Sequence, residues 1–179
     1  MMNNTKAFFS AVAFATAAIA APMAMAADIS KPTQALVLID GTVDFGATFG
    51  KGNKDNTFAD KYTFTTTGVN YVDSLISSIA KNSAKGLDIT GFALFTSTGS
   101  LIADGEQENT GKIDLWSLSV ESLAAGSYYV QVSGNLVSKD SGSYGANLNL
   151  APVPEPETYG MIIAGLGILG FLARRRKAA

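Results

Sequence analysis

The middle of the chain consists of short apolar or alternating runs, and a glycine follows most of them. In the run 62–67, Tyr62, Phe64 and Thr66 share one face of an extended strand, and three threonines occupy the other face. This alternation is typical of a strand that is buried on one side. The expected strand-forming runs are 35–39, 62–67, 87–95, 113–120, 128–137 and 146–150. Repeated short strands between turn residues predict an all-β fold, an antiparallel sandwich of about seven to nine strands.

The segment 69–80 fits two patterns. Val69, Val72 and Ile76 recur at helical spacing, whereas positions 71, 73 and 75 alternate as they would in a strand. We expect a strand here, because the neighbouring segments have β patterns and small polar residues are frequent.

The composition excludes several classes of site, because the 179 residues include no histidine and no cysteine. Disulfides, thiolate nucleophiles, histidine-based catalytic triads and most zinc, haem and copper sites are therefore ruled out. The segment 27–153 carries 8 lysines and 13 acidic residues, and the three arginines lie together at 174–176. This charge distribution gives no sign of nucleic-acid binding. We expect no cofactor and no metal.

The first 26 residues have the pattern of a secretory signal peptide. Lys6 supplies the positive charge, the run 7–21 is apolar, and Ala24 and Ala26 provide the small residues of a cleavage site before Ala27. We therefore expect export through the Sec translocon and a mature chain, one domain over 27–153, that begins near Ala27. The alternative is an uncleaved membrane anchor, which the alanine-rich cleavage pattern disfavours.

The last 26 residues have three parts. Pro154, Glu155 and Pro156 form a stiff extended segment, because each proline fixes its own φ and biases the preceding residue away from helix. The run 159–173 is uncharged. As a helix it would be about 22 Å long, against a hydrocarbon core of about 30 Å. A tetrabasic run follows: Arg174, Arg175, Arg176 and Lys177.

We expect residues 159–173 to form a single inner-membrane span, with the basic run as a stop on the cytoplasmic side. Tyr159 and snorkelling basic side chains would compensate for the short length, together with local thinning of the bilayer. The alternative is a buried core helix, which the terminal basic run disfavours.

This three-part segment resembles the PEP-CTERM sorting signal of Gram-negative bacteria, with the Pro-Glu-Pro triplet, the glycine-rich apolar run and the arginine-rich end in the same order. The resemblance implies recognition by an exosortase, a membrane-embedded enzyme that cuts near the triplet. It also implies that the chain is a substrate, held first at the inner membrane and then released to the cell surface or the extracellular polysaccharide.

A second resemblance lies in the body of the chain. Phe58, Asp60 and Tyr62 resemble the Phe-x-Asp-x-Phe motif of a PEP-CTERM subfamily, with tyrosine in place of the last phenylalanine. The segments 123–134 and 142–150 resemble the closing strands of that subfamily. The resemblance implies fold and export but no activity. We expect Asp60 to be structural, bonded to backbone N–H groups between aromatic neighbours, rather than a Ca²⁺ ligand.

The other polar and aromatic candidates have simple structural interpretations. The acidic stretch 104–109 does not have EF-hand spacing and is expected to be a solvated loop. Asp40 and Asp44 lie at a turn and the strand after it, and only their distance in space would show a glycosidase pair. Trp116 is expected in the core rather than as a platform for sugars.

These patterns predict an exported, non-enzymatic protein of the cell surface or extracellular matrix, sorted and cut by an exosortase. The alternative is a carbohydrate-binding or Ca²⁺-dependent adhesive module delivered by the same route. A small hydrolase that uses only carboxylates is a third hypothesis.

Overall fold

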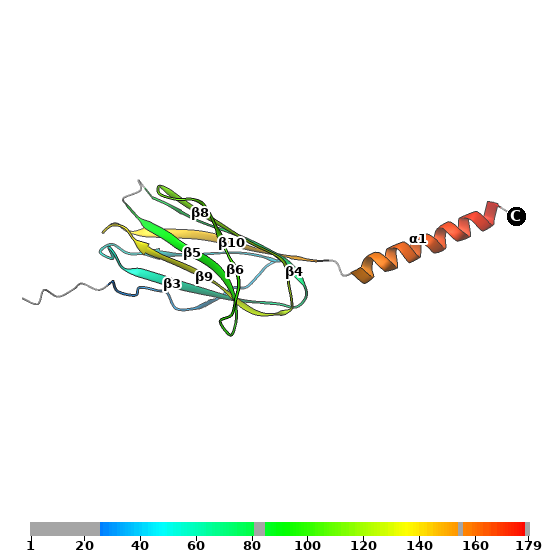
Figure 1. Ribbon diagram of the computed structural model, residues 1–179, viewed down its shortest axis with the longest axis horizontal. Helices are drawn as coiled ribbons and strands as arrows, with labels where there is room; N and C mark the ends of the chain where they lie inside the picture. Colours follow the sequence, from blue (N-terminus) through cyan, green and yellow to red (C-terminus); the bar gives the residue numbers. More distant parts are fainter. Residues whose placement is uncertain (1–25, 81–84, 154–155, 178–179) are drawn as a thin grey trace, which may run out of the picture.

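A computed structural model describes residues 26–80, 85–153 and 156–177, which form a β-sandwich followed by a helix (Figure 1). The described residues contain ten strands, slightly more than expected, and one helix, α1 (Pro156–Lys177). The strands are β1 (Gln34–Ala35), β2 (Thr42–Phe49), β3 (Thr57–Thr66), β4 (Asn70–Ile79), β5 (Leu87–Thr96), β6 (Leu101–Asp104), β7 (Glu106–Asn109), β8 (Ile113–Leu123), β9 (Gly126–Leu136) and β10 (Gly142–Pro152).

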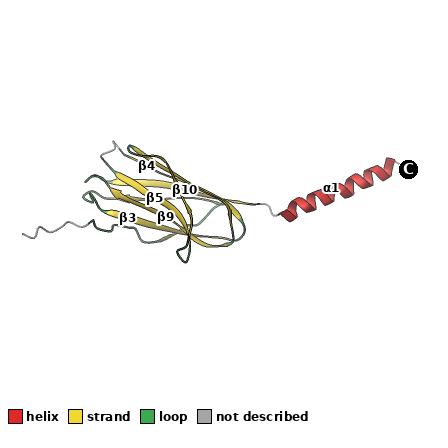
Figure 2. Ribbon diagram, viewed as in Figure 1, coloured by secondary structure: helices red, strands yellow, loops and turns green. Residues whose placement is uncertain are grey.

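Two five-stranded sheets make up the sandwich (Figure 2). The first sheet has the order β1-β3-β9-β5-β6, and the second has the order β2-β10-β4-β8-β7. The short pair β1–β3 is parallel, and the other strand pairs are antiparallel. From β2 to β5 and from β8 to β10 the chain changes sheet at every connection, so most turns join the two layers rather than close hairpins.

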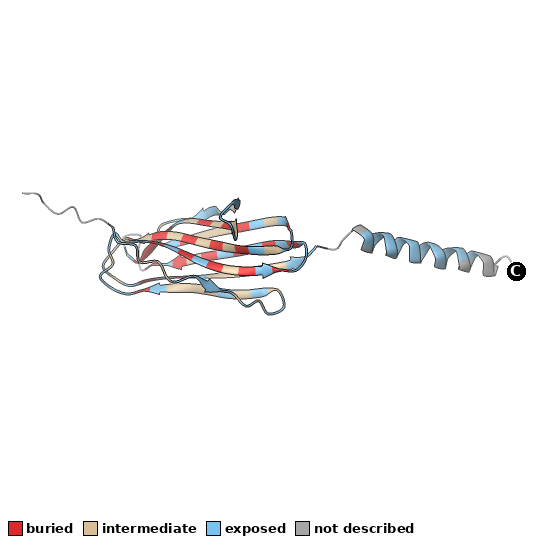
Figure 3. Cartoon of the chain, turned by 90° about the horizontal axis from the view of Figure 1, so that it is seen from below, coloured by how far each residue is buried: buried red, intermediate tan, exposed pale blue. Residues whose placement is uncertain are grey.

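The core lies between the sheets, and buried residues alternate with less buried ones along the long strands (Figure 3). In β3 the pattern of exposed and buried residues alternates along all ten positions, and Tyr62, Phe64 and Thr66 are buried as expected. The largest fully buried side chains are Tyr62, Phe49, Phe92, Ile76, Ile89, Leu94, Leu118, Leu136, Leu148, Val72, Val130 and Val132. Their burial is the main stabilising contribution to the fold.

The strand expected over 69–80 is confirmed as β4. Its even-numbered positions face the core, and these include Ser74 and Ser78, which are almost fully buried. Both serines donate to backbone oxygens, of Asn147 and Leu87 respectively. The helical spacing of apolar residues in this segment was therefore coincidental, because these serines interrupt the apolar inner face of the strand.

The strand expected over 35–39 is wrong for most of its length. Pairing stops after Ala35, and Val37 and Ile39 are exposed. This segment has to cross from β1 in one sheet to β2 in the other, so it cannot stay paired with β3. The crossing ends in a turn in which Asp40 and Gly41 both have positive φ.

The solvated loop expected over 104–109 is also wrong, because Asp104 ends β6 and residues 106–109 form β7. The side chains of β7 are exposed, so the prediction of solvation was correct and the prediction of a loop was not. Gly105 carries the chain from one sheet to the other. Its N–H donates to the Phe92 oxygen at 2.7 Å, and a Cβ would lie 2.8 Å from the oxygens of Phe92 and Ser117. Acidic side chains on this edge strand oppose pairing with another chain.

Candidate functional site

Asp60 lies at the centre of a buried aromatic cluster on β3. Phe58, Asp60 and Tyr62 all face the core, and none of the three is more than 3% exposed. The rings of Phe49 and Phe58 stack with centroids 4.5 Å apart, and the Phe58 and Tyr144 rings stack at 5.7 Å. The expected arrangement of Asp60 between two aromatic neighbours on one strand face is therefore present.

Two donors satisfy the Asp60 carboxylate. The backbone N–H of Lys31 donates to Oδ1, and the hydroxyl of Tyr144 donates to Oδ2, each at 2.6 Å. The hydroxyl oxygens of Tyr62 and Tyr144 lie 2.9 Å apart. Burial raises the pKa of Tyr144, and its hydrogen bond to Asp60 raises that pKa further, so the hydroxyl keeps its proton and remains a donor.

This arrangement makes Asp60 a structural clamp between separate segments of the fold. It joins the segment before β1, through Lys31, to β3 of the first sheet and, through Tyr144, to β10 of the second sheet. The sequence did not reveal Lys31 and Tyr144 as partners, because they lie 29 and 84 residues from Asp60 and no local pattern marks them.

A second buried carboxylate, that of Asp114, lies at the start of β8. It is 1% exposed and accepts from the N–H of Ile89 at 3.3 Å and from the N–H of Gly111 at 3.0 Å. Burial raises the pKa of the neighbouring Asp88, and repulsion from the Asp114 carboxylate raises it further. Asp114 therefore orders backbone groups where β5 and β8 meet. Its charge makes the ionised form of Asp88 less favourable.

The raised pKa of Asp88 predicts a measurable pH effect. The folded chain holds this proton more tightly than the unfolded chain, so the free energy of unfolding falls as the pH rises from the ordinary aspartate pKa of about 3.9 through the raised value. Asp88→Asn removes the charge and should increase stability at neutral pH while leaving it little changed near pH 4, as measured by urea unfolding at both pH values. Asp44→Asn, at an exposed position of β2, is the control; an equal gain in the control would contradict the assignment.

The other acidic candidates lie at exposed positions of the described chain. Asp40 is exposed in the turn before β2, and Asp44 is exposed on β2 itself. Among the residues described, no group of three or more carboxylates is placed to hold a metal ion.

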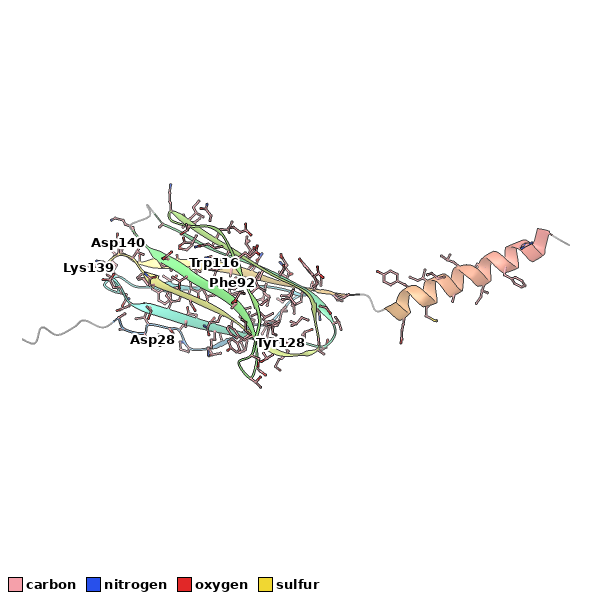
Figure 4. The ribbon with its side chains drawn as sticks, in the orientation of Figure 1. Asp28, Phe92, Trp116, Tyr128, Lys139 and Asp140 are labelled. Atoms are coloured by element: carbon pink, nitrogen blue, oxygen red, sulfur yellow. The ribbon has the colours of Figure 1, made fainter. Side chains whose placement is uncertain are left out.

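Trp116 lies on the inner side of β8 but is only partly buried, so the expectation of a core position is only partly met. Its indole N–H donates to the Ile89 oxygen across the sandwich at 3.2 Å. Trp116 and Phe92, both labelled in Figure 4, are among the residues that line a hollow beside β5 and β9. The sequence missed this hollow, because its lining comes from four separate strands, β5, β6, β8 and β9, and from Gly105.

The expected signal-peptide junction lies at the edge of the described structure. Residues 1–25, which include Ala24, lie outside the described residues. Ala26 is exposed. The N–H of Ala27 donates to Asn56 Oδ1, and the Ala27 oxygen accepts from the N–H of Thr57, both at 3.0 Å. Residue 27 is thus the point from which the described chain is hydrogen-bonded to β3.

The expected C-terminal signal begins where the sandwich ends. Val153 is the residue immediately before the Pro-Glu-Pro triplet, and its N–H donates to the Val69 oxygen at 3.0 Å. Pro154 and Glu155 lie outside the described residues, and Pro156 is the first residue of α1, where a missing N–H has no cost. Arg174 is exposed near the end of α1, and residues 175–177 complete the helix.

Helix α1 lies apart from the sandwich, and its apolar side chains are exposed (Figure 1). Met161, Ile162 and Ile163 are consecutive and point about 100° apart, so apolar surface extends around the helix. The transmembrane span expected over 159–173 is not found: among the described residues, no helix is both long and apolar enough to cross a membrane. The uncharged run has 15 residues, and four of them are glycine.

A comparison with protein families decides the nature of this segment. Residues 152–177, from the last residue of β10 through the whole of α1, match the family described as the PEP-CTERM protein-sorting motif. The chain carries a PEP-CTERM sorting motif. The motif supports exosortase-dependent sorting of an exported protein, with the exosortase as its processing partner. The Phe-x-Asp-x-Phe subfamily remains a prediction.

Two further comparisons concern the whole chain. No curated protein matches it. Among solved structures, this chain is similar to the pre-peptidase C-terminal domain of a collagenase from Bacillus anthracis. The sequence identity is 16% and the TM-score is 0.43. The similarity covers 66% of this chain and 96% of that domain.

Proposed function

We propose that the chain is a non-enzymatic exported protein, whose β-sandwich an exosortase releases to the cell surface or extracellular matrix by cutting near Pro154, Glu155 and Pro156. The PEP-CTERM match to residues 152–177 is the observation that carries this proposal. The Sec translocon would export the precursor, and the mature chain would start at Ala27.

The position of the triplet supports processing at this place. The sandwich is hydrogen-bonded up to Val153, and the helix begins at Pro156. A protease that cuts here removes the apolar helix and leaves every strand of the sandwich intact. The product would be the folded body with one short tail.

The surface of α1 supports a role in holding the precursor. Ile162, Leu166 and Leu169 are each more than half exposed, and such a surface is costly in water. We propose that α1 associates with the inner membrane until the exosortase acts, with Arg174 and the basic residues after it on anionic headgroups.

The buried carboxylates support the non-enzymatic part of the proposal. Asp60 and Asp114, the two fully buried acids of the described chain, accept hydrogen bonds from backbone or tyrosine donors on both of their oxygens. Acids that are buried and bonded to donors of the chain itself have the ordinary role of ordering the fold.

Intact mass spectrometry tests the sorting proposal. The full chain is expressed in a Gram-negative host that has an exosortase and in the same host without it. We expect a secreted species that begins at Ala27 and ends within about 154–160 only in the first host. Glu155→Ala should accumulate the unprocessed, membrane-associated precursor.

Glu157→Ala is the matched control, because Glu157 is also a glutamate of this segment but lies in the first turn of α1. It should be processed like the unchanged chain. A secreted protein that still ends in the segment 174–179, or equal processing of the Glu155 variant, would refute exosortase cleavage at the triplet.

A further inference from the structure

A hollow of about 460 Å³ lies on the side of the sandwich where the outer surface of β5 and β9 meets the crossover from β6 to β7. We name it the side groove and define it by six of its lining residues: Thr90, Phe95, Asp104, Trp116, Gln131 and Ser133. Its volume is within the range of about 300–1,000 Å³ typical of sites that bind small ligands. The motif and its processing make no use of this groove.

The backbone shapes the side groove in advance of any ligand. A bulge between Ile89 and Gly91 leaves Thr90 outside the pairing of β5 with β9. Strand β6 pairs with β5 only from Ala93 onward, so the preceding part of the β5 edge is not covered by β6. Gly105 fixes the far wall through its bond to Phe92. These features belong to hydrogen-bonded strands and to one close backbone approach. No loop has to become ordered before a ligand could bind.

The floor of the side groove is low because its side chains are small. Gly91 lies opposite Ser133 in the register, and a Cβ at Gly91 would be 3.8 Å from Ser133 Cβ. Ala93 lies opposite Gln131 in the next row. Larger side chains at these positions would fill the hollow.

Two aromatic side chains border the side groove, and both are held in place. The Phe95 ring stacks on Tyr129 with centroids 5.1 Å apart and an angle of 13° between the ring planes. The Trp116 indole is fixed by its hydrogen bond to Ile89. Gln131, Ser133, Thr90 and Asp104 supply amide, hydroxyl and carboxylate groups between and beside the rings.

We propose that the side groove binds a segment of a neutral polysaccharide. Aromatic rings with fixed orientations present flat apolar surfaces for the C–H faces of hexose units, and planar or hydroxyl side chains beside them pair with sugar hydroxyls. Asp104 lies in the groove, and the body carries an excess of acidic residues, so an acidic polysaccharide would be repelled. This inference is independent of the sorting proposal, because the purified chain would bind whether or not it is processed.

The experiment uses Trp116, the single tryptophan of the chain, as a fluorescent reporter in the groove. The purified full chain is titrated with soluble dextran, mixed-linkage β-glucan, galactomannan and xylan, and with alginate as an acidic comparison. Affinity electrophoresis in gels that contain each polymer gives a second readout. We expect at least one neutral polymer to shift the Trp116 emission and retard migration, and alginate to do neither.

Phe95→Ala should weaken this binding about tenfold, as loss of an aromatic anchor does. Gln131→Ala should also weaken it and provides a second test if the first variant does not fold. Tyr71→Ala is the matched control, because Tyr71 is an exposed aromatic residue on β4 of the opposite sheet, and it should bind like the unchanged chain. Binding to none of the neutral polymers, preference for alginate, or equal binding by the folded Phe95 and Gln131 variants would overturn the proposal.

Discussion

Replacing Gly134 by alanine should destabilise the sandwich by about 3 kcal/mol or more, the upper part of the range for overpacking a core. Gly134 lies in β9, in the middle of the first sheet, and pairs with Phe58 on one side and Ile89 on the other. A Cβ at this position would lie 2.5 Å from Phe58 Cζ and closer still to the Asp88 backbone oxygen. Neither the backbone of β5 nor the packed Phe58 ring can move away without disturbing the core.

Gly145 provides the matched control. It also lies within a long strand with a neighbour on each side, β10, but nothing is within 4 Å of the place where its Cβ would be. Gly145→Ala should therefore stabilise the protein by about 0.5 kcal/mol, because alanine loses less conformational freedom on folding. Urea unfolding of the two variants measures the difference, and similar stabilities would show that the contacts at Gly134 are not tight.

The second large effect is expected at Asp60. Asp60→Ala removes the acceptor of both the Lys31 N–H and the Tyr144 hydroxyl inside the core. The loss should lower the free energy of unfolding by about 3 kcal/mol, because buried donors are left without partners. Asp60→Asn keeps the shape and one acceptor but points an amide N–H₂ at a donor, and it should cost about 1–2 kcal/mol.

The control for Asp60 is Asp73→Ala, because Asp73 is an aspartate within a strand of the same fold, at an exposed position of β4. It should change stability by less than about 0.5 kcal/mol. Chemical denaturation of the three variants gives the order. A chain with Asp60→Ala that unfolds like the Asp73 variant would contradict the role of Asp60 as the clamp between the sheets.

The all-β class and several strands could be predicted because they rest on period-two alternation. In β3 and β9 one face is buried and the other is not, so the sequence carries the pattern directly. The segment after Ala35 could not be predicted in the same way. Its apolar residues resemble a strand, but the need to reach β2 in the other sheet prevents pairing, and that need belongs to the topology.

The candidate sites show the same division. The PEP-CTERM motif is contiguous in the chain, so its order of features is readable from residues alone, and the family comparison confirms it. Asp60 could be placed between aromatic neighbours, but its partners Lys31 and Tyr144 come from distant segments. The side groove joins the outer face of one sheet to Trp116 of the other, and only the packing of the sheets brings these residues together.

The interior place of β10 in its sheet has a mechanical consequence. This strand pairs with β2 along one side and with β4 along the other, and it runs directly toward the sorting motif. A force that draws the tail along the strand axis must slide β10 past both neighbours at once, rupturing two ladders together in shear instead of peeling one edge open. A body tethered by its tail would therefore withstand traction from fluid flow or from a translocating machine while keeping its shape.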